Sequence, residues 1–428
     1  MTTATQSVGR VNWKIIIIGF LAVMIDGFDT AALAGSIPAL AESWGVKPGA
    51  FTYPLVLTNI GVVIGYLVSG RLGASLGRKT LLIASVAACA VTTALSAVAI
   101  PLESMAVFSV IRLLAGIAIG VVLPVAVAIS ADLAPERYRQ RISAGVTLGL
   151  ATGLTVGGVF GGSLIEWFGT GGMFWAGAVA AVPLVVLMMA LLEEPPAVGT
   201  KQDAQRAAGV ARLFEGSMWS RTLLLWAFAF LVFIAAYTLT SWVPTLLLDY
   251  GFTANEAPIG LAFVSFGGVL GGILLIPMTA RAGISASLVV MSLLGVIAMV
   301  TVGLTDFGSV GVLLLLLGAG AGVTASQIGQ LTLAVSIYSA GARTTGVGLA
   351  AAIGRIGSIV GPGAAGILIA LQMSASNIIL VAAIPVAVAC VAAVGLTLQE
   401  RRRSGSGSAD DPAAVGHDAD GRTNHPIP

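Results

Sequence analysis

The stretch from Ile15 to Leu40 reads IIIIGFLAVMIDGFDTAALAGSIPAL. A helix of about 20 apolar residues crosses a bilayer, and this stretch is longer than that, yet it carries two aspartates in its interior. At a rise of about 1.5 Å per residue, Asp26 falls roughly 17 Å from Ile15, near the middle of a hydrocarbon layer about 30 Å thick. Asp29 follows at i+3 and Thr30 at i+4, so the three side chains share one helix face. A carboxylate facing lipid would be costly there, so we expect this face to look into protein or a water-filled cavity, where acidic side chains commonly carry protons or ions.

The same apolar character runs through the whole chain. Of its 428 residues, 57% are hydrophobic and 9% are charged, whereas soluble domains carry about 25% charged residues. The apolar stretches are too long for the strands of a β-barrel. We therefore predict an all-α membrane protein with twelve transmembrane helices. The helices are predicted at residues 13–36, 51–73, 80–99, 104–130, 142–165, 172–192, 221–247, 257–279, 285–304, 309–336, 345–370 and 376–397.

The basic residues predict the orientation of these helices, because short cytoplasmic loops carry an excess of Lys and Arg. Both termini are expected in the cytoplasm of a bacterial cell, with the protein in the inner membrane and the first helix retained rather than cleaved as a signal peptide. No nucleic acid partner is expected, since the basic residues are topological signals. The loops on the basic side hold Arg71, Arg78, Lys79, Arg137, Arg139, Arg141, Lys201, Arg206, Arg212, Arg281, Arg343 and Arg401 to Arg403, and the opposite loops hold Lys47 with Glu42, Glu103, Glu166, Asp249, Glu256 and Asp306.

The chain divides into two related halves. We predict an N-terminal arm at 1–12, six-helix bundles at 13–192 and 221–400, a cytoplasmic linker at 193–220 and a disordered tail at 401–428. Pro38 and Pro244, and likewise Gly77 and Gly283, are each separated by 206 residues (244 − 38 and 283 − 77). Two pseudo-symmetric repeats around a central site are typical of secondary transporters. Glycines at close helical spacing recur in the fifth and eleventh helices, where they favour close helix packing.

Two arginines also lie inside predicted helices, Arg112 in the fourth and Arg355 in the eleventh. Arg stays charged, so each needs an acid, a carbonyl dipole or water. One interpretation is a purely structural buried ion pair with Asp26 or Asp29. The other is that the aspartates bind protons while at least one arginine meets an anionic substrate.

Other side chains are candidates to line a cavity around these charges. Polar and aromatic groups suit a site for an aromatic ring and its substituents, although Trp242 is equally well explained as a residue of the aromatic belt at the membrane surface. The candidates are Tyr237, Thr240, Ser241, Trp242, Gln327 and Gln330.

The sequence offers little for metal or cofactor chemistry. Cys89 and Cys390 each lie alone in an apolar stretch and are interpreted as small hydrophobic residues. Both histidines, His417 and His425, lie in the tail. We expect no metal, no cofactor and no enzyme activity.

With these residues in hand, the chain resembles the major facilitator superfamily and, within it, the aromatic acid:proton symporter family. The resemblance covers roughly residues 13 to 400. It is carried by DGFD from Asp26 to Asp29, RLLAGIAIG from Arg112 to Gly120, Glu194-Pro195, SWVPTLL from Ser241 to Leu247, RTTGVG from Arg343 to Gly348, GRIG from Gly354 to Gly357, and Gly361-Pro362.

The resemblance implies roles for several residues. Asp26 and Asp29 would couple transport to protons, Arg112 and Arg355 would serve substrate or coupling, and Asp132 and Arg343 would form part of a cytoplasmic gate. The loop after the second helix departs from the family pattern, because Ala74 and Ser75 replace an acid and an adjacent Arg. We therefore expect a gate latch that is weaker or is built from Arg78, Asp132 and Arg343. The GQL sequence near Gln327 also departs from the family's GLN.

The leading hypothesis is proton-driven uptake of an aromatic carboxylic acid, such as a hydroxybenzoate, by a monomer. The alternatives are transport of a non-aromatic organic acid, efflux of a drug-like compound and, with less support, a substrate sensor.

Overall fold

The computed structural model describes residues 13–135, 138–192, 213–214, 218–305, 307–338 and 340–407. The predicted arm, most of the predicted linker and the tail beyond residue 407 lie outside the described residues. So do Glu194, Pro195, His417 and His425.

Twelve long helices make up the described chain, and all are long and apolar enough to cross a membrane, so the predicted fold class is confirmed. No strand occurs among the described residues. Three short 3-10 helices, η1 (Pro48–Phe51), η2 (Ile100–Leu102) and η4 (Leu248–Tyr250), lie in connections. The long helices are α1 (Trp13–Ser43), α2 (Thr52–Leu76), α3 (Arg78–Ala99), α4 (Met105–Asp132), α5 (Arg139–Phe168), α6 (Gly172–Leu191), α8 (Met218–Leu247), α9 (Ile259–Ala282), α10 (Ile284–Leu304), α11 (Gly308–Ile337), α12 (Ala340–Ala370) and α13 (Ala375–Gly407).

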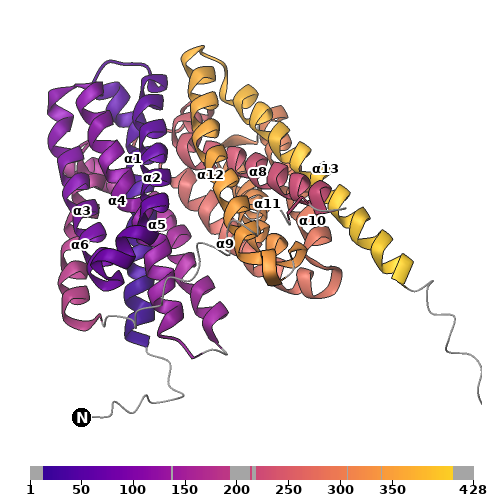
Figure 1. Ribbon diagram of the computed structural model, residues 1–428. Helices are drawn as coiled ribbons and strands as arrows, with labels where there is room; N and C mark the ends of the chain where they lie inside the picture. Colours follow the sequence, from indigo (N-terminus) through magenta and orange to yellow (C-terminus); the bar gives the residue numbers. More distant parts are fainter. Residues whose placement is uncertain are drawn as a thin grey trace, which may run out of the picture.

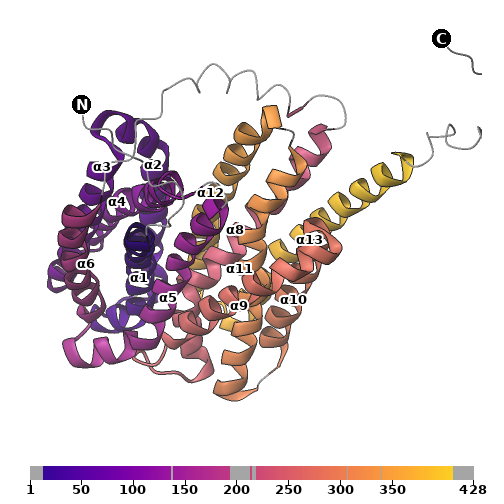
Figure 2. The same cartoon turned by 90° about the horizontal axis from the view of Figure 1, so that it is seen from below.

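The helices form two groups in space (Figure 1). Helices α1 to α6 make an N-terminal bundle, and α8 to α13 make a C-terminal bundle beside it. Figure 2 shows the same separation from below, with α5 lying along the boundary. The bundles meet mainly through α5 on α9, α1 on α8, and α2 on α12.

Several helices extend beyond their predicted ends. α1 continues to Ser43, and α13 continues through Arg401 and Arg402 to Gly407. Hydropathy marks the part of a helix that suits lipid, whereas backbone hydrogen bonding continues into polar sequence. Near its end α13 is fixed to α10, because the Ser285 hydroxyl donates a hydrogen bond to the Glu400 carboxylate at 2.8 Å.

The turns of the two bundles repeat in structure as in sequence. Gly77 and Gly283 join consecutive helices at φ +82° and +80°, and Gly45 and Gly251 follow their helices at +61° and +84°. Each pair is separated by 206 residues (283 − 77 and 251 − 45). Only glycine adopts such positive φ values without strain, which explains why these positions keep glycine in both halves.

Glycines also bring helix backbones together inside each bundle. A Cβ on Gly116 or Gly120 of α4 would collide with the backbone of Thr58 or Val62 on α2. The same holds for Gly357 of α12 against Phe230 of α8. In lipid, helices have no hydrophobic driving force to associate. Small residues at this spacing let the helix backbones come close, so that van der Waals contact holds them together.

The contacts between the bundles gather at one end of the molecule, the end remote from Trp13 and Gly407. Gly158 and Gly162 of α5 lie against the backbone of Ala262 and Asn255, and Gly366 of α12 lies against Thr52. The end of the bundles nearer the termini differs, because a Cβ added to Gly145 of α5 or to Gly348 of α12 would meet no atom within 4 Å.

The buried apolar residues follow the same division. One cluster joins residues from both bundles, including Ile37, Phe51, Trp242 and Leu261. The other two belong to a single bundle each, one around Val86 and Ile129 of the N-terminal bundle and one in the C-terminal bundle. Among the described residues, the hydrophobic core that the two bundles share therefore lies at the end remote from the termini.

The connection between the bundles ends against the C-terminal bundle. Leu213 is fully buried, and the Thr222 hydroxyl of α8 donates to its carbonyl at 2.9 Å. The ring of Phe214 packs edge-on against Trp226. Residues at the end of the predicted linker are thus part of the packed C-terminal bundle.

Candidate functional site

Asp29 is bound on both oxygens inside the N-terminal bundle. The Arg112 guanidinium of α4 donates to its two carboxylate oxygens at 2.6 and 3.1 Å, and the Thr93 hydroxyl of α3 donates at 2.6 Å. Asp29 is 1% exposed and Arg112 is 0% exposed. The Phe174 ring lies 5.9 Å from the guanidinium carbon. Such a bidentate, charge-assisted pair is among the strongest polar contacts in proteins.

Asp26, one helical turn earlier, is in a different position. It is 7% exposed, and its carboxylate forms no ion pair within 4.0 Å and no hydrogen bond with another described side chain. The Thr30 hydroxyl, predicted on the same face, donates instead to the Asp26 backbone carbonyl at 3.1 Å. Arg355 and Asp29 are its electrostatic neighbours. The two aspartates are thus close in sequence but unequal in partners.

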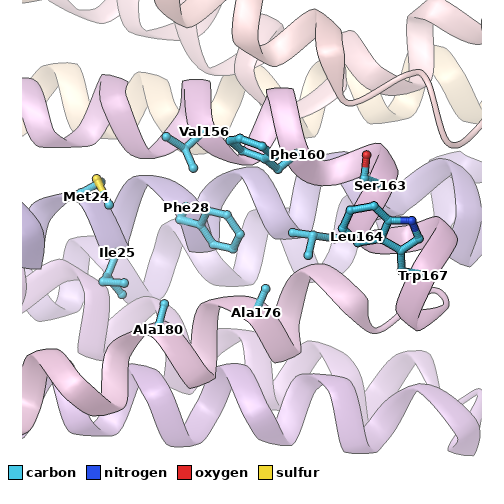
Figure 3. Close-up of a pocket in the computed structure, with 10 residues that line it drawn as sticks. All are labelled: Met24, Ile25, Phe28, Val156, Phe160, Ser163, Leu164, Trp167, Ala176 and Ala180. Atoms are coloured by element: carbon cyan, nitrogen blue, oxygen red, sulfur yellow. The ribbon is translucent and has the colours of Figure 1, made fainter.

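Phe28, between the two aspartates, faces away from these charges. It lines an apolar groove of about 280 Å³ between α1, α5 and α6, together with Met24, Phe160 and Trp167 (Figure 3). No charged side chain lines this groove. The polar chemistry of α1 is therefore confined to its other faces.

Arg355 of α12 is surrounded by aromatic rings. Its two terminal nitrogens donate to the hydroxyls of Tyr237, at 2.6 Å, and Tyr66, at 2.5 Å. The guanidinium carbon lies 4.3 Å from the centre of the Tyr66 ring, 5.9 Å from that of Tyr237 and 6.0 Å from that of Phe233. No carboxylate of a described residue lies within 4.0 Å of Arg355. We call Arg355, Tyr66, Phe233 and Tyr237 the arginine cage.

The arginine cage joins the two bundles. Tyr66 comes from α2, whereas Phe233, Tyr237 and Arg355 come from α8 and α12. Both tyrosines and Arg355 are partly exposed. Rings that face a cation stabilise it through their π-electrons.

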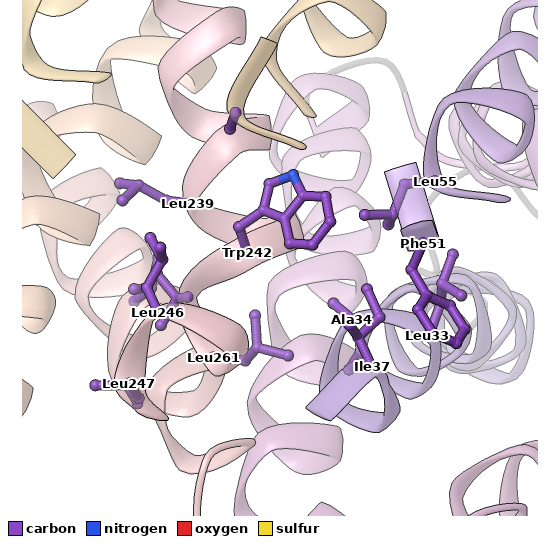
Figure 4. Close-up of a cluster of buried hydrophobic side chains, with 14 of the residues drawn as sticks. Leu33, Ala34, Ile37, Phe51, Leu55, Leu239, Trp242, Leu246, Leu247 and Leu261 are labelled. Atoms are coloured by element: carbon purple, nitrogen blue, oxygen red, sulfur yellow. The ribbon is translucent and has the colours of Figure 1, made fainter. Parts of the chain in front are cut away.

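Trp242, a candidate for substrate contact, lies inside the protein. Its side chain is 0% exposed, and its indole N–H donates to the Pro362 carbonyl at 2.9 Å. Figure 4 shows it between Leu239 and Leu55, within the cluster that joins the bundles. It therefore does not lie at the membrane surface, and a part in substrate binding stays a prediction.

The remaining cavity candidates lie on α8 and α11. Gln327 is partly exposed, whereas Gln330 is buried and its side-chain oxygen has no hydrogen-bond partner among the described residues. Ser241 is buried, and the Thr240 hydroxyl donates to its own helix, at the Ala236 carbonyl.

The gate residues predicted from the resemblance are described only in part. Arg78, at the start of α3, forms an ion pair with Asp132, at the end of α4, and each side chain is about one-third exposed. This pair lies within the N-terminal bundle. The side chain of Arg343 lies outside the described residues. Ala74 and Ser75 are exposed at the end of α2.

Sequence reasoning missed Tyr66, Thr93, Phe174 and Phe233. Each lies in an apolar helix without a motif of its own, and only the fold brings it to a charge. The sequence indicated only that an Arg within the membrane must have partners. It did not indicate which residues those partners are. Among the described residues, no three His, Cys, Asp or Glu side chains gather as metal ligands would.

Comparisons with known proteins agree on one family. The family model described as "Major Facilitator Superfamily" matches residues 19–362. The chain is 28% identical to the 4-hydroxybenzoate transporter PcaK of Pseudomonas putida, covering 91% of this chain and 93% of that protein. It is 30% identical to the 3-(3-hydroxy-phenyl)propionate transporter of Escherichia coli (strain K12), covering 87% and 91%. The inward open structure of the xylose transporter XylE from E. coli aligns with a TM-score of 0.71 at 15% identity, covering 89% and 94%.

Proposed function

This chain belongs to the Major Facilitator Superfamily, and on that premise we propose that it imports an aromatic carboxylic acid together with protons. The protein is a multi-pass membrane transporter whose relatives include transporters of 4-hydroxybenzoate and 3-(3-hydroxyphenyl)propionate. Transport of an aromatic carboxylic acid by this chain, and its coupling to protons, are our proposals.

One observation carries the proposal, namely the arginine cage. Arg355 is partly exposed, has no carboxylate of a described residue within 4.0 Å and is bordered by three aromatic rings. Such a guanidinium suits a ligand with both a carboxylate and a ring. Arg binds carboxylates through two parallel hydrogen bonds. Aromatic surfaces pair with a ligand ring by offset stacking or edge contact.

Asp26 is the proposed proton carrier. Asp29 is held by Arg112 and Thr93, whereas Asp26 has no such partner and lies in the electrostatic field of Arg355. An anionic substrate at Arg355 beside an ionised Asp26 would place two negative charges around one guanidinium. A proton on Asp26 relieves that repulsion, so proton and substrate favour each other's binding, and the coupling is reciprocal.

The driving force follows from the number of protons. An anion that enters with one proton moves no net charge. A second proton would make uptake depend on membrane potential, by about 2.3 kcal/mol per charge per 100 mV.

The direction of opening follows from the proposed orientation. If the basic loops and both termini lie in the cytoplasm, the bundles touch at their periplasmic ends, and the structure corresponds to an inward-facing state of a monomer in a bacterial inner membrane. Arg78, Asp132 and Arg343 would then lie on the cytoplasmic side and act as its gate. Arg112 would support coupling through Asp29, and Gln327 would contact the substrate.

The deciding experiment is uptake into proteoliposomes. Labelled benzoate, 4-hydroxybenzoate and 3-(3-hydroxyphenyl)propionate are offered with an inward proton gradient and again after a protonophore. Accumulation that collapses with the protonophore supports symport and ranks the substrates. Folded protein that accumulates none of them would indicate a non-aromatic acid, an exported compound or a sensor that moves no solute.

A further inference from the structure

We propose that the hydroxyls of Tyr66 and Tyr237 occupy the two positions on Arg355 that a substrate carboxylate takes, and that release of Tyr66 on binding disconnects the two bundles at this point. The inference rests on the proposed function, because it names where the carboxylate binds and what it displaces. Tyr66 becomes a positioning residue that links occupancy to conformation.

Tyr237 and Tyr66 accept hydrogen bonds from different terminal nitrogens of the same guanidinium, at 2.6 and 2.5 Å. The two oxygens of a carboxylate bind the same pair of nitrogens in the fork arrangement that Arg prefers. The tyrosine hydroxyls thus stand where two carboxylate oxygens would be.

A phenol hydroxyl is a neutral acceptor, and hydrogen bonds to an ionised acceptor are about twice as strong. No described carboxylate lies within 4.0 Å of Arg355 to supply that charge. A carboxylate that arrives in the cage therefore displaces the hydroxyls, while the rings remain beside the guanidinium.

The two hydroxyls are not equivalent. Tyr237 and Arg355 belong to the same bundle, on α8 and α12, so their bond spans no boundary. Tyr66 is on α2, so its bond to Arg355 connects the two bundles across 289 residues of chain. Loss of the first bond changes the site alone, whereas loss of the second also changes how the bundles are held.

Tyr66→Phe and Tyr237→Phe therefore form a matched pair. Each keeps its ring and removes one hydroxyl from the same guanidinium. Because each variant removes a competing neutral hydrogen bond, worth about 1 kcal/mol, both are expected to bind benzoate about three- to tenfold more tightly. Equilibrium dialysis with labelled benzoate on purified, full-length protein measures this.

Conformation is measured by electron–electron double resonance between spin labels at Thr80→Cys of α3 and Ala282→Cys of α9. Both positions are exposed at the ends where the bundles do not share a core. Cys390 is replaced by Ala, while the buried Cys89 stays. Without ligand, Tyr66→Phe is expected to show the distance distribution that the parent protein shows with saturating benzoate, and Tyr237→Phe the distribution of the ligand-free parent.

Three outcomes would overturn the inference. They are weaker benzoate binding in Tyr66→Phe, identical distances in Tyr66→Phe and Tyr237→Phe, and a parent protein whose distances do not respond to bound benzoate. A parent that takes up benzoate while the variants behave alike contradicts the inference and leaves the proposed function intact. A parent that neither binds nor takes up any member of the aromatic panel contradicts both.

Discussion

Asp26 and Asp29 lie about one turn apart on α1, yet their side chains have different partners. Both oxygens of Asp29 are bound by Arg112 and Thr93, so the removal of its charge would leave a buried guanidinium without compensation. The Asp26 carboxylate forms no ion pair with a described residue within 4.0 Å. The pair should therefore separate stability from coupling.

Asp29→Asn is expected to destabilise the protein. Breaking a buried ion pair by removing one partner costs about 3–5 kcal/mol, and Arg112 is 0% exposed. Thermal unfolding of purified protein should show a clearly lower midpoint for Asp29→Asn, with Asp26→Asn close to the parent as the matched control. Equal midpoints would mean that the Arg112–Asp29 pair does not stabilise the fold.

Asp26→Asn is expected to uncouple transport from protons. The variant keeps the size of the side chain and, like a protonated Asp, offers both a donor and an acceptor, but it cannot ionise. Exchange of labelled for unlabelled substrate across the membrane should persist, while accumulation against a gradient should be lost. Normal accumulation by Asp26→Asn would refute its assignment as the proton carrier.

Arg355→Lys tests whether the guanidinium fork matters beyond its charge. Lys keeps the positive charge but presents a point donor in place of two parallel ones. Because a hydrogen bond to a charged group contributes about 1.5–3 kcal/mol, we expect benzoate affinity to fall about ten- to a hundredfold. An unchanged dissociation constant would place the carboxylate elsewhere.

The charged residues of the site could be named from sequence, but their partners could not. Asp26, Asp29, Arg112 and Arg355 stand out because ionisable groups are rare within membrane helices. Pairing is a property of three dimensions, and the sequence left open which arginine meets which acid. Tyr66 had no signal at all, since an isolated tyrosine in an apolar helix is ordinary. The functional roles of all these residues stay predictions.

Helix α5 presents glycine to two different neighbours. Gly149 and Gly153 lie against the backbone of α1, within the N-terminal bundle. Gly158 and Gly162 lie against residues Ala262 and Asn255 of the other bundle. The glycine spacing predicted close packing, but only the fold divides these residues between a fixed contact and a contact between the bundles.

Gly158→Ala is expected to disfavour the conformation described here. Its Cβ would collide with the backbone around Ala262, which cannot move aside as a flexible side chain can. Gly145→Ala in the same helix is the control, because no atom lies within 4 Å of the added Cβ. Uptake should fall severalfold in Gly158→Ala alone. Equal uptake by both variants would contradict a moving contact at Gly158.

Local hydrogen bonds hold the turn before α9, which contacts α5. Before α9, Thr253 donates both its backbone N–H and its hydroxyl to the Glu256 carboxylate at 2.9 Å. These bonds stabilise the ionised form and hold the pKa of Glu256 below its usual range. The turn that carries Asn255 to α5 is therefore expected to keep its form in mildly acidic surroundings.

The fold of the whole chain could be predicted because few structures can span a bilayer. A segment in lipid must satisfy its own backbone hydrogen bonds, which leaves helices and closed barrels. Twelve hydrophobic stretches and a repeat of 206 residues were sufficient to predict twelve helices in two bundles, which the structure confirms. Hydropathy could not give the helix ends, as α1 and α13 show, because hydrogen bonding does not stop where lipid stops. It also could not tell which ends of the bundles meet.

Reporter fusions test the proposed orientation of the chain in the membrane. A green fluorescent protein fused after the C-terminal residue should fluoresce, and alkaline phosphatase at the same place should be inactive, because both termini are proposed to be cytoplasmic. Phosphatase inserted at Thr170, between α5 and α6, should be active. The reverse pattern would invert the proposed orientation and with it the direction in which the structure opens.

The long final helix has a practical consequence. α13 runs without interruption to Gly407, it projects from the bundle in Figure 1, and Glu400 ties it to α10 near its end. A soluble domain fused in helical register at Gly407 would be connected to the bundle by a continuous helix and not by a flexible linker. Such a fusion gives a small, featureless membrane particle a landmark for alignment in electron cryo-microscopy, and would bring the ligand-bound states of this transporter within reach of imaging.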